Sequence, residues 1–213
     1  MTLAFGNAAE IAAALPRVRQ QLLADRVIAY PTETVYGLGG RVTPAALALL
    51  RRVKGREAGK SFVVLVTGPE MAREWGIGFP DAAAHLARVW WPGPLTLVLP
   101  AAPGRMPDEL RGPTGGIAIR QSPHPGASAL VEALGEPLTS TSANRSGEAP
   151  LNGAAAIAAA FADAAGAGEL IVLDGGLLGA ALPSTVVEFR NGEAALVREG
   201  AIARHDVRRT LEA

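Results

Sequence analysis

The sequence lacks cysteine entirely over its 213 residues. Disulfide bonds, thiol nucleophiles and cysteine-ligated metals are therefore excluded. Its three histidines, His85, His124 and His205, lie far apart in the chain, so we expect no histidine-built zinc site and no protein-bound metal. No apolar run reaches the roughly 18 residues that a membrane-spanning helix needs, and the N-terminus lacks the features of a secretion signal. These absences predict a cytoplasmic protein.

Lysine is also scarce. The chain has 20 cationic side chains, and its two lysines, Lys54 and Lys60, lie within one short segment, whereas the others are arginines. A chain that otherwise uses arginine favours lysine where a compact ammonium is needed in place of a planar guanidinium. The alternative is that two lysines fell close together by chance on a solvated loop. This segment alone does not decide between the two interpretations.

The charges of the chain balance, with 20 acidic and 20 basic side chains and a formal net charge of zero. This balance argues against a protein whose whole surface binds nucleic acid. A local basic groove remains compatible with it, because the arrangement of charges and not their sum sets the field. Hydrophobic residues make up 49% of the chain and charged residues 19%, as in a globular protein. At this length we expect one large domain.

Apolar strands and helices alternate along the chain. Asn7 begins a helix with Glu10 in a capping box, Thr43 begins another, and Asn191-Gly192 is a strong hairpin signal. Residues 31–40 are expected to form a polar turn that ends in glycines. The order predicts one α/β domain with a twisted mixed sheet. The strands are expected at 27–30, 62–66, 95–99, 116–120, from 137, and at 169–174, 184–189 and 194–198, with helices near 8–24, 44–53, 69–75, 81–89, 126–134, 153–162 and in the tail.

Residues 55–61, Gly-Arg-Glu-Ala-Gly-Lys-Ser, nearly spell a phosphate-binding loop. The motif needs four residues between its glycines, and this segment has three. Its context is also inverted, because a helix precedes the segment and a strand follows it. We therefore do not expect a true phosphate loop. The cations can still bind phosphate through their side chains, without a nest of backbone amides.

Polar residues follow several of the predicted strands. Thr32, Thr34 and Tyr36 form one cluster, residues 140–144 form a second, and Arg120 and Arg198 end strands. Hydroxyl-rich turns are often only turns, and arginine also occurs as an ordinary edge residue. If the strands are parallel neighbours, however, these groups converge on a cavity rich in hydroxyls and cations and poor in carboxylates. Such a cavity suits an anionic substrate, such as a nucleotide with a carboxylate, better than acid–base hydrolysis.

Six motifs follow one another along the chain. They are 31–39 (PTETVYGLG), 54–56 (KGR), 91–96 (WPGPLT), 119–125 (IRQSPHP), 140–147 (STSANRSG), and 184–186 (STV) with 198–200 (REG). In these motifs and their order the chain resembles the YrdC/TsaC-type family of L-threonylcarbamoyladenylate synthases, from about residue 8 to 202. The resemblance implies one YrdC-like α/β domain over residues 1–213, with a twisted mixed parallel and antiparallel sheet flanked by helices around a concave basic groove.

The resemblance also implies a reaction, in which a nucleotidyltransferase converts L-threonine, bicarbonate and ATP into threonylcarbamoyl-AMP and pyrophosphate. The product would serve proteins that modify the tRNA adenosine beside the anticodon, and Mg²⁺ would be held mainly by ATP oxygens. The implied catalytic residues are Lys54, Arg56, Ser142 and Asn144. Those implied for ATP are Arg56, Lys60, Ser142, Asn144 and Arg198, and those implied for L-threonine are Thr34, Arg120, Ser140 and Ser184.

The chain departs from the family pattern at three positions: Ser61 replaces a usual proline, Leu65 a usual histidine, and Gly116 a usual threonine. Loss of the histidine puts one contact to threonine or carbamate in question. Two other functions are compatible with parts of the sequence. One is a double-stranded RNA-binding factor of translation or ribosome maturation without synthase activity, which the neutral charge disfavours. The other is a carbamoyl-adenylating relative from hydrogenase maturation. The lack of cysteines and of extra domains disfavours this function.

Overall fold

The computed structural model describes residues 1–56, 59, 61–179 and 181–213. Within this part of the chain, ten strands form one sheet in the order β1-β8-β2-β3-β7-β4-β6-β5-β9-β10. The strands are β1 Thr2–Ala4, β2 Val27–Pro31, β3 Tyr36–Gly39, β4 Val63–Leu65, β5 Leu95–Leu99, β6 Ile117–Arg120, β7 Leu138–Ser142, β8 Leu170–Asp174, β9 Thr185–Arg190 and β10 Glu193–Arg198.

The sheet is mixed, as predicted. Parallel pairs join β1 to β8, β8 to β2, β4 to β6, and β5 to β9. The other neighbours are antiparallel. The helices that flank the sheet are α1 Ala8–Leu23, α2 Pro44–Lys54, α3 Pro69–Glu74, α4 Asp81–Trp90, α5 Pro125–Leu134, α6 Ala154–Ala160, α7 Ala162–Gly166 and α8 Arg204–Glu212, with a 3₁₀ turn at Asp108–Leu110.

Strand β2 shows how the sheet separates two hydrophobic cores. All five of its residues are buried, so its sequence is a continuous apolar run and does not alternate with polar residues. Val27 and Ala29 point into the larger core, whereas Ile28 and Tyr30 point into the smaller one. This division follows from the two-residue period of a strand.

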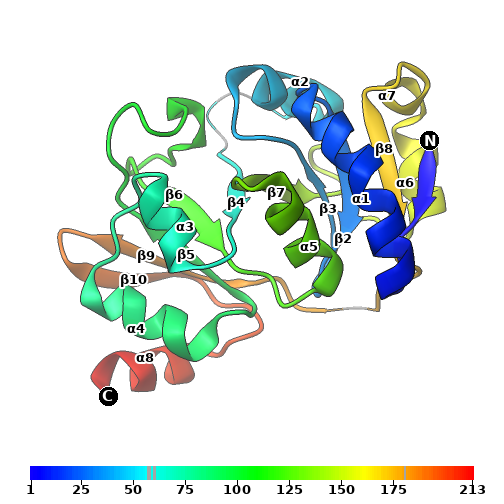
Figure 1. Ribbon diagram of the computed structural model, residues 1–213. Coiled ribbons are helices and arrows are strands. Elements are labelled where there is room, and N and C mark those ends of the chain that lie inside the picture. The colour runs from blue at the N-terminus through cyan, green and yellow to red at the C-terminus, as the bar shows by residue number, and fades with distance from the viewer. Residues whose placement is uncertain (57–58, 60, 180) are drawn as a thin grey trace.

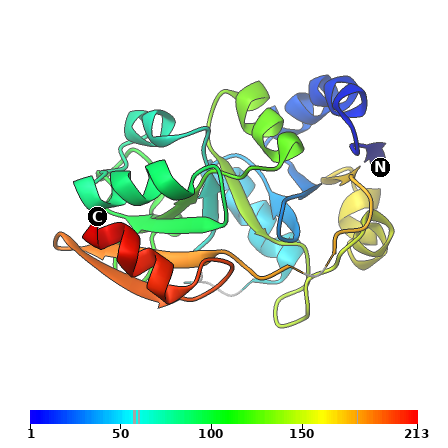
Figure 2. The ribbon, with the colours of Figure 1, turned by 90° about the horizontal axis from the view of Figure 1, so that it is seen from below.

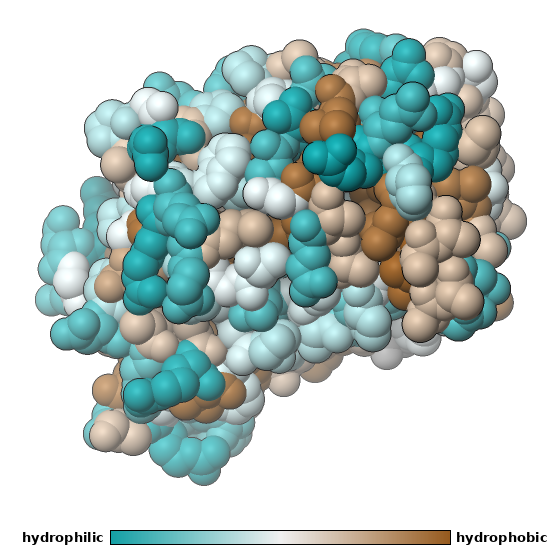
Figure 3. Space-filling model, in the orientation of Figure 1, coloured by the Kyte–Doolittle hydropathy of each residue, from teal (hydrophilic) through white to brown (hydrophobic). Residues whose placement is uncertain are grey.

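The helices gather in two groups around the sheet. Figure 1 shows α1 and α5 together beside β2, where they cover the smaller core. Helices α4 and α8 pack together near β5, β9 and β10, and the view from below in Figure 2 shows the same grouping. The two termini lie at opposite ends of the molecule in both views. Polar and apolar residues are interspersed over the face drawn in Figure 3. Among the described helices, none is both long and apolar enough to cross a lipid bilayer.

Helix ends near the site follow local sequence signals. The side chain of Thr43 accepts a hydrogen bond from the Ala46 amide at 3.2 Å and caps the start of α2. The helix ends after Lys54, because Gly55 adopts a φ of 65°, in the left-handed region that favours glycine. This turn carries the chain from α2 towards β4 and directs Lys54 and Arg56 to the sheet.

The expectation for the polar segment 31–40 was wrong in part, and no strand was expected at the N-terminus. Residues 36–39 do not belong to a turn, because they form β3, which pairs antiparallel with β2. Strand β1 was missed, since three residues are too short to show a period. Position 39 requires glycine because β3 lies close to β7. A Cβ at this position would lie 2.0 Å from the Thr139 carbonyl oxygen of β7.

The C-terminal hairpin was predicted correctly. Strands β9 and β10 are antiparallel and join through Asn191 and Gly192, whose φ values of 53° and 86° are both positive. Helix α8 then packs against α4, where the Trp90 indole donates a hydrogen bond to the Thr210 hydroxyl at 3.1 Å. The hairpin places Arg198, at the end of β10, beside Ser184.

Candidate active site

A cavity of about 380 Å³ lies across the middle of the sheet, within the size range of small-molecule sites. Five neighbouring strands, β3, β7, β4, β6 and β5, each contribute to its wall. One residue from each, in that order, is Gly37, Ser140, Val63, Arg120 and Thr96. The turn between β2 and β3 and the segment before β9 close its sides. Residues from all six sequence motifs therefore meet in or beside one cavity.

The polar groups meet at one cavity, as predicted, but not because they follow parallel neighbouring strands. Strands β2, β3, β7 and β4 are successive antiparallel neighbours, so parallel strand ends do not bring the polar turns together. The cross-strand register does so instead. Ser142 lies opposite Gly37, and Ser140 lies opposite Val63. Because Ser140 and Ser142 are two residues apart on one strand, their side chains share a face, and both line the cavity.

Lys54, Ser142 and Asn144 form a hydrogen-bonded cluster at the end of β7. The Lys54 Nζ donates to the Ser142 carbonyl oxygen at 2.5 Å and to the Asn144 carbonyl and Oδ1, both at 3.1 Å. The Ser142 hydroxyl donates to Asn144 Oδ1 at 2.5 Å. The Asn144 amide nitrogen in turn donates to the carbonyl oxygens of Arg145 and Glu148. The cluster thus fixes the loop that follows β7.

Two members of this cluster lie behind the cavity wall. Lys54 is only 2% exposed and Asn144 only 6%, and Ser142 is the member that lines the cavity. Burial, and then the neighbouring charge of Arg56, lower the pKa of Lys54 to about 8. The contacts between the lysine and the cavity wall therefore run through the backbone and side chain of Ser142. The catalytic role that the family resemblance implies for Lys54 stays a prediction.

The lowered pKa of Lys54 predicts an alkaline limit to activity. As the pH rises through about 8, the ammonium loses a proton and with it one of the donors that hold Ser142. We expect the turnover rate at saturating substrates to fall with a midpoint near pH 8. The pKa is lower in the folded chain than its ordinary value of 10.5, so the unfolded chain binds more protons between these values. The contribution of Lys54 to the free energy of unfolding therefore rises as the pH increases from about 8 to 10.5.

Turnover followed on both sides of pH 8, together with thermal unfolding, checks this expectation. The fall in rate should occur while the fold stays intact. The residual rate of a Lys54→Ala variant should lack the same alkaline limb. A rate that stays level well above pH 8 in the unmodified protein would contradict the assignment.

Arg56 lies at the edge of the cavity beside β4. Its Nη2 donates to the Ser61 carbonyl oxygen at 2.8 Å, its Nη1 lies 3.5 Å from the Thr141 hydroxyl, and its guanidinium stacks 5.1 Å from the centre of the Phe62 ring. These contacts aim a planar cation into the cavity. Burial lowers the pKa of Arg56, with a further effect from Arg51. The predicted partner Lys60 lies outside the described residues.

Ser184 and Arg198 form the opposite wall. The Ser184 hydroxyl lies 2.9 Å from the Thr96 hydroxyl, and Arg198 Nη2 donates to the Ser184 carbonyl oxygen at 2.8 Å and to its hydroxyl at 3.2 Å. Thr96 and Ser184 are both buried. This network ties the end of β10 to the start of β9, so that the cavity has a cation on each side.

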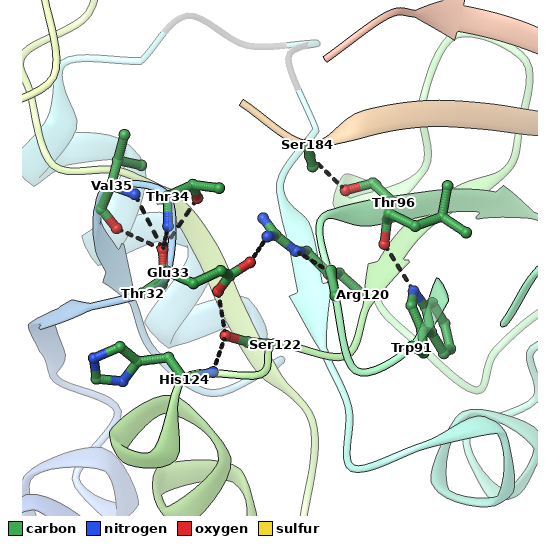
Figure 4. Close-up of polar contacts among 12 residues, drawn as sticks. Thr32, Glu33, Thr34, Val35, Trp91, Thr96, Arg120, Ser122, His124 and Ser184 are labelled. Carbon is green, nitrogen blue, oxygen red and sulfur yellow. Dashed lines mark hydrogen bonds and ion pairs between the residues drawn. The ribbon is translucent and has the colours of Figure 1, made fainter. Parts of the chain in front are cut away.

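Arg120, which is buried, and Glu33, which is half-buried, form an ion pair in the cavity, which Figure 4 shows in detail. Arg120 Nη2 pairs with Glu33 Oε1, and the other oxygen of Glu33 accepts a hydrogen bond from the Ser122 hydroxyl at 2.6 Å. Burial lowers the pKa of Arg120 to about 10. The sequence predicts a cavity poor in carboxylates, and Glu33 was not among the predicted site residues. The available signal was an acidic residue in a hydroxyl-rich segment directly after a buried strand.

The remaining predicted residues also meet the cavity. Thr34 is buried, and its hydroxyl lies 3.2 Å from that of Thr32. Of the three departures from the family pattern, Ser61 and Leu65 line the cavity, whereas Gly116 packs against Val98 outside its lining. Leu65 lies opposite Arg120 in the pairing of β4 with β6, at the position where the resemblance implied a histidine.

Comparison with known proteins identifies the family of the chain. A family model for Sua5, YciO and YrdC proteins, described as telomere recombination, matches residues 20–200. The chain belongs to the Sua5/YciO/YrdC family. The resemblance inferred from the six motifs is confirmed, and so is the mixed sheet flanked by helices.

Several members of the Sua5/YciO/YrdC family are close in sequence or structure. A threonylcarbamoyl-AMP synthase of Chromohalobacter salexigens is 39% identical over 168 residues, covering 78% of this chain and 88% of that protein. P. abyssi Sua5 complexed with L-threonine matches 99% of this chain with a TM-score of 0.85 and 28% identity. This chain spans 60% of that longer protein. E. coli YciO matches with a TM-score of 0.77 and 25% identity, covering 94% of both chains.

Proposed function

We propose that the chain is an L-threonylcarbamoyladenylate synthase, a nucleotidyltransferase that uses L-threonine, bicarbonate and ATP. The observation that carries the proposal is a cavity with three guanidinium groups among hydroxyls, in a chain whose relatives are named threonylcarbamoyl-AMP synthase. The guanidiniums belong to Arg56, Arg120 and Arg198. Arginine binds carboxylate and phosphate through paired N–H groups. The names of these relatives give no support to the RNA-binding alternative, and they identify an enzyme of transferase type.

The proposed reaction joins three anionic or zwitterionic molecules in one cavity. Threonine and bicarbonate combine with loss of water to give a carbamate. A carbamate oxygen then forms a bond to the α-phosphorus of ATP, and the bond from that phosphorus to pyrophosphate breaks. Such a transfer needs positioning and neutralisation of charge rather than a strong base.

Two sets of residues are assigned to the two parts of the product. We assign ATP to Arg56, Lys60, Ser142, Asn144 and Arg198, with Lys54 as a positioning residue that acts through Ser142. This assignment is supported by Ser142, which lines the cavity and donates a hydrogen bond to Asn144. We assign L-threonine to Thr34, Arg120, Ser140 and Ser184, with the carboxylate on Arg120.

Magnesium would enter as the complex with ATP, as part of the substrate. Among the described residues no group of three or more histidine, aspartate or glutamate side chains could hold a metal ion. The cavity carboxylate, Glu33, is engaged by Arg120 and Ser122. Oxygen atoms of phosphate are suitable ligands for Mg²⁺. The product would pass to proteins that transfer threonylcarbamoyl groups to tRNA.

Pyrophosphate release tests the proposed function. Purified protein with ATP, bicarbonate and Mg²⁺ should release pyrophosphate only when L-threonine is added. Dependence on threonine separates the proposed synthase from a simple ATP hydrolase, since a hydrolase would release product without it. Release that is independent of threonine, or no release at all, would contradict the proposal.

A further inference from the structure

The acidic side chain of the cavity has a restricted set of partners. Glu33 Oε1 and Arg120 Nη2 are both buried, and each has no hydrogen-bond partner among the described residues apart from the ion pair that joins them. Glu33 Oε2 is held by the Ser122 hydroxyl at 2.6 Å. Both charged residues line the cavity. The cavity therefore presents a negative and a positive group side by side.

Arg120 keeps donor capacity for a ligand. Its Nε donates to the Gly93 carbonyl oxygen at 3.1 Å, and its Nη2 faces Glu33. No hydrogen bond joins Nη1 to a described residue. Figure 4 shows the guanidinium tip between Glu33 and Ser184, both of which line the cavity. A carboxylate can therefore reach Arg120 while Glu33 remains beside it.

An ion pair that served stability alone would gain little here. Taking both charges out of water costs several kcal/mol per ion, and apolar residues of similar volume often replace a buried pair without loss. Most of the cavity is lined by hydroxyls and apolar groups, yet this corner holds opposite charges. An anion-binding site alone has no need of a carboxylate, which repels the ligand.

We propose that Glu33 and Arg120 together recognise a zwitterion, with Arg120 binding the carboxylate of the substrate amino acid and Glu33 binding its ammonium. Glu33 is thereby the residue that selects an α-amino acid over the same acid without its amine. This inference rests on the proposed function, because it concerns the amino-acid side of the same cavity. Ser122 positions Glu33 through the bond to its second oxygen.

A comparison of two ligands tests the role of Glu33. L-threonine and (R)-3-hydroxybutyrate carry the same carboxylate and hydroxyl, but the second lacks the amine. We expect the unmodified protein to bind threonine much more tightly. The preference is the dissociation constant for (R)-3-hydroxybutyrate divided by that for L-threonine. In a Glu33→Gln variant this ratio should fall about ten-fold or more, because a charge-assisted hydrogen bond to the ammonium is lost. Glutamine keeps the size of the side chain and still accepts from Ser122.

Further variants separate recognition from folding. Glu33→Asp keeps the charge, so its ratio should stay nearer that of the unmodified protein. Glu169→Gln, which removes a carboxylate from the ion pair with Arg52 outside the cavity, should leave the ratio unchanged. A Glu33→Gln ratio equal to that of the unmodified protein would overturn the inference and leave the proposed function standing. An unmodified protein that does not bind threonine would instead overturn the proposed function.

Discussion

Replacing Lys54 by alanine is expected to lower the rate of threonine-dependent pyrophosphate release by at least about 100-fold, the scale of losing one preorganised polar group of an active site. The ammonium holds the carbonyl oxygens of Ser142 and Asn144 and the Asn144 side chain. Without it, the chain after β7 loses the bonds that fix Ser142 at the cavity wall. Ser142 would then no longer present its hydroxyl in one place.

The same substitution should also lower the free energy of unfolding, by about 1–3 kcal/mol, because buried carbonyl oxygens lose their donor. The loss of turnover should therefore be measured at a temperature where thermal unfolding shows the variant to be folded. Arg52→Ala is the matched control, since Arg52 lies two residues earlier on α2 and its side chain is 64% exposed in its pair with Glu169. Normal turnover in a folded Lys54→Ala variant would contradict the role assigned to Lys54.

Replacing Arg120 by methionine is expected to raise the dissociation constant for L-threonine by at least about 30-fold, with little change for ATP. Truncating one partner of a buried charge pair costs about 2–5 kcal/mol or more, much of it from the charge left unpaired. Here the carboxylate of the ligand would lose its cation, and Glu33 would be left beside it without a counter-charge. Titration calorimetry with each ligand separately gives both constants.

A double variant separates affinity from stability. In Arg120→Met the unpaired Glu33 should also destabilise the fold. Adding Glu33→Gln removes that charge, so the double variant should regain stability without regaining threonine affinity. Arg41→Met is the control, because Arg41 forms a comparable pair with Glu136 outside the cavity, and it should affect stability alone. Recovery of threonine affinity in the double variant would show that Arg120 does not bind the carboxylate.

Much of the fold could be predicted from local signals. The Thr43 cap, the apolar run 27–30 and the Asn191-Gly192 turn each set the conformation of their own segment. Strand β3 was hidden because its residues, Tyr-Gly-Leu-Gly, carry two glycines, which are typical of turns. Gly39 is needed because β3 and β7 approach closely: a Cβ added at this position would lie only 2.0 Å from the Thr139 carbonyl oxygen. That packing depends on β7, about a hundred residues away.

The site was less predictable than the fold, because its contacts join distant segments. The residues of the cavity were found through the family motifs, but their arrangement depends on the strand order. The family motifs implied Lys54 as a catalytic residue, but no local pattern indicated that it is buried in contact with Ser142 and Asn144. Glu33 was overlooked since no local pattern shows that Arg120, far along the chain, lies beside it.

The most direct test of the central claim is to identify the product. The protein would be incubated with ATP, L-threonine, Mg²⁺ and isotopically labelled bicarbonate, and the nucleotides would be examined by mass spectrometry. The account predicts an adenylate that contains both threonine and the bicarbonate label, formed by the unmodified protein and not by Lys54→Ala. Formation of AMP or ADP alone, with no labelled adenylate, would contradict it.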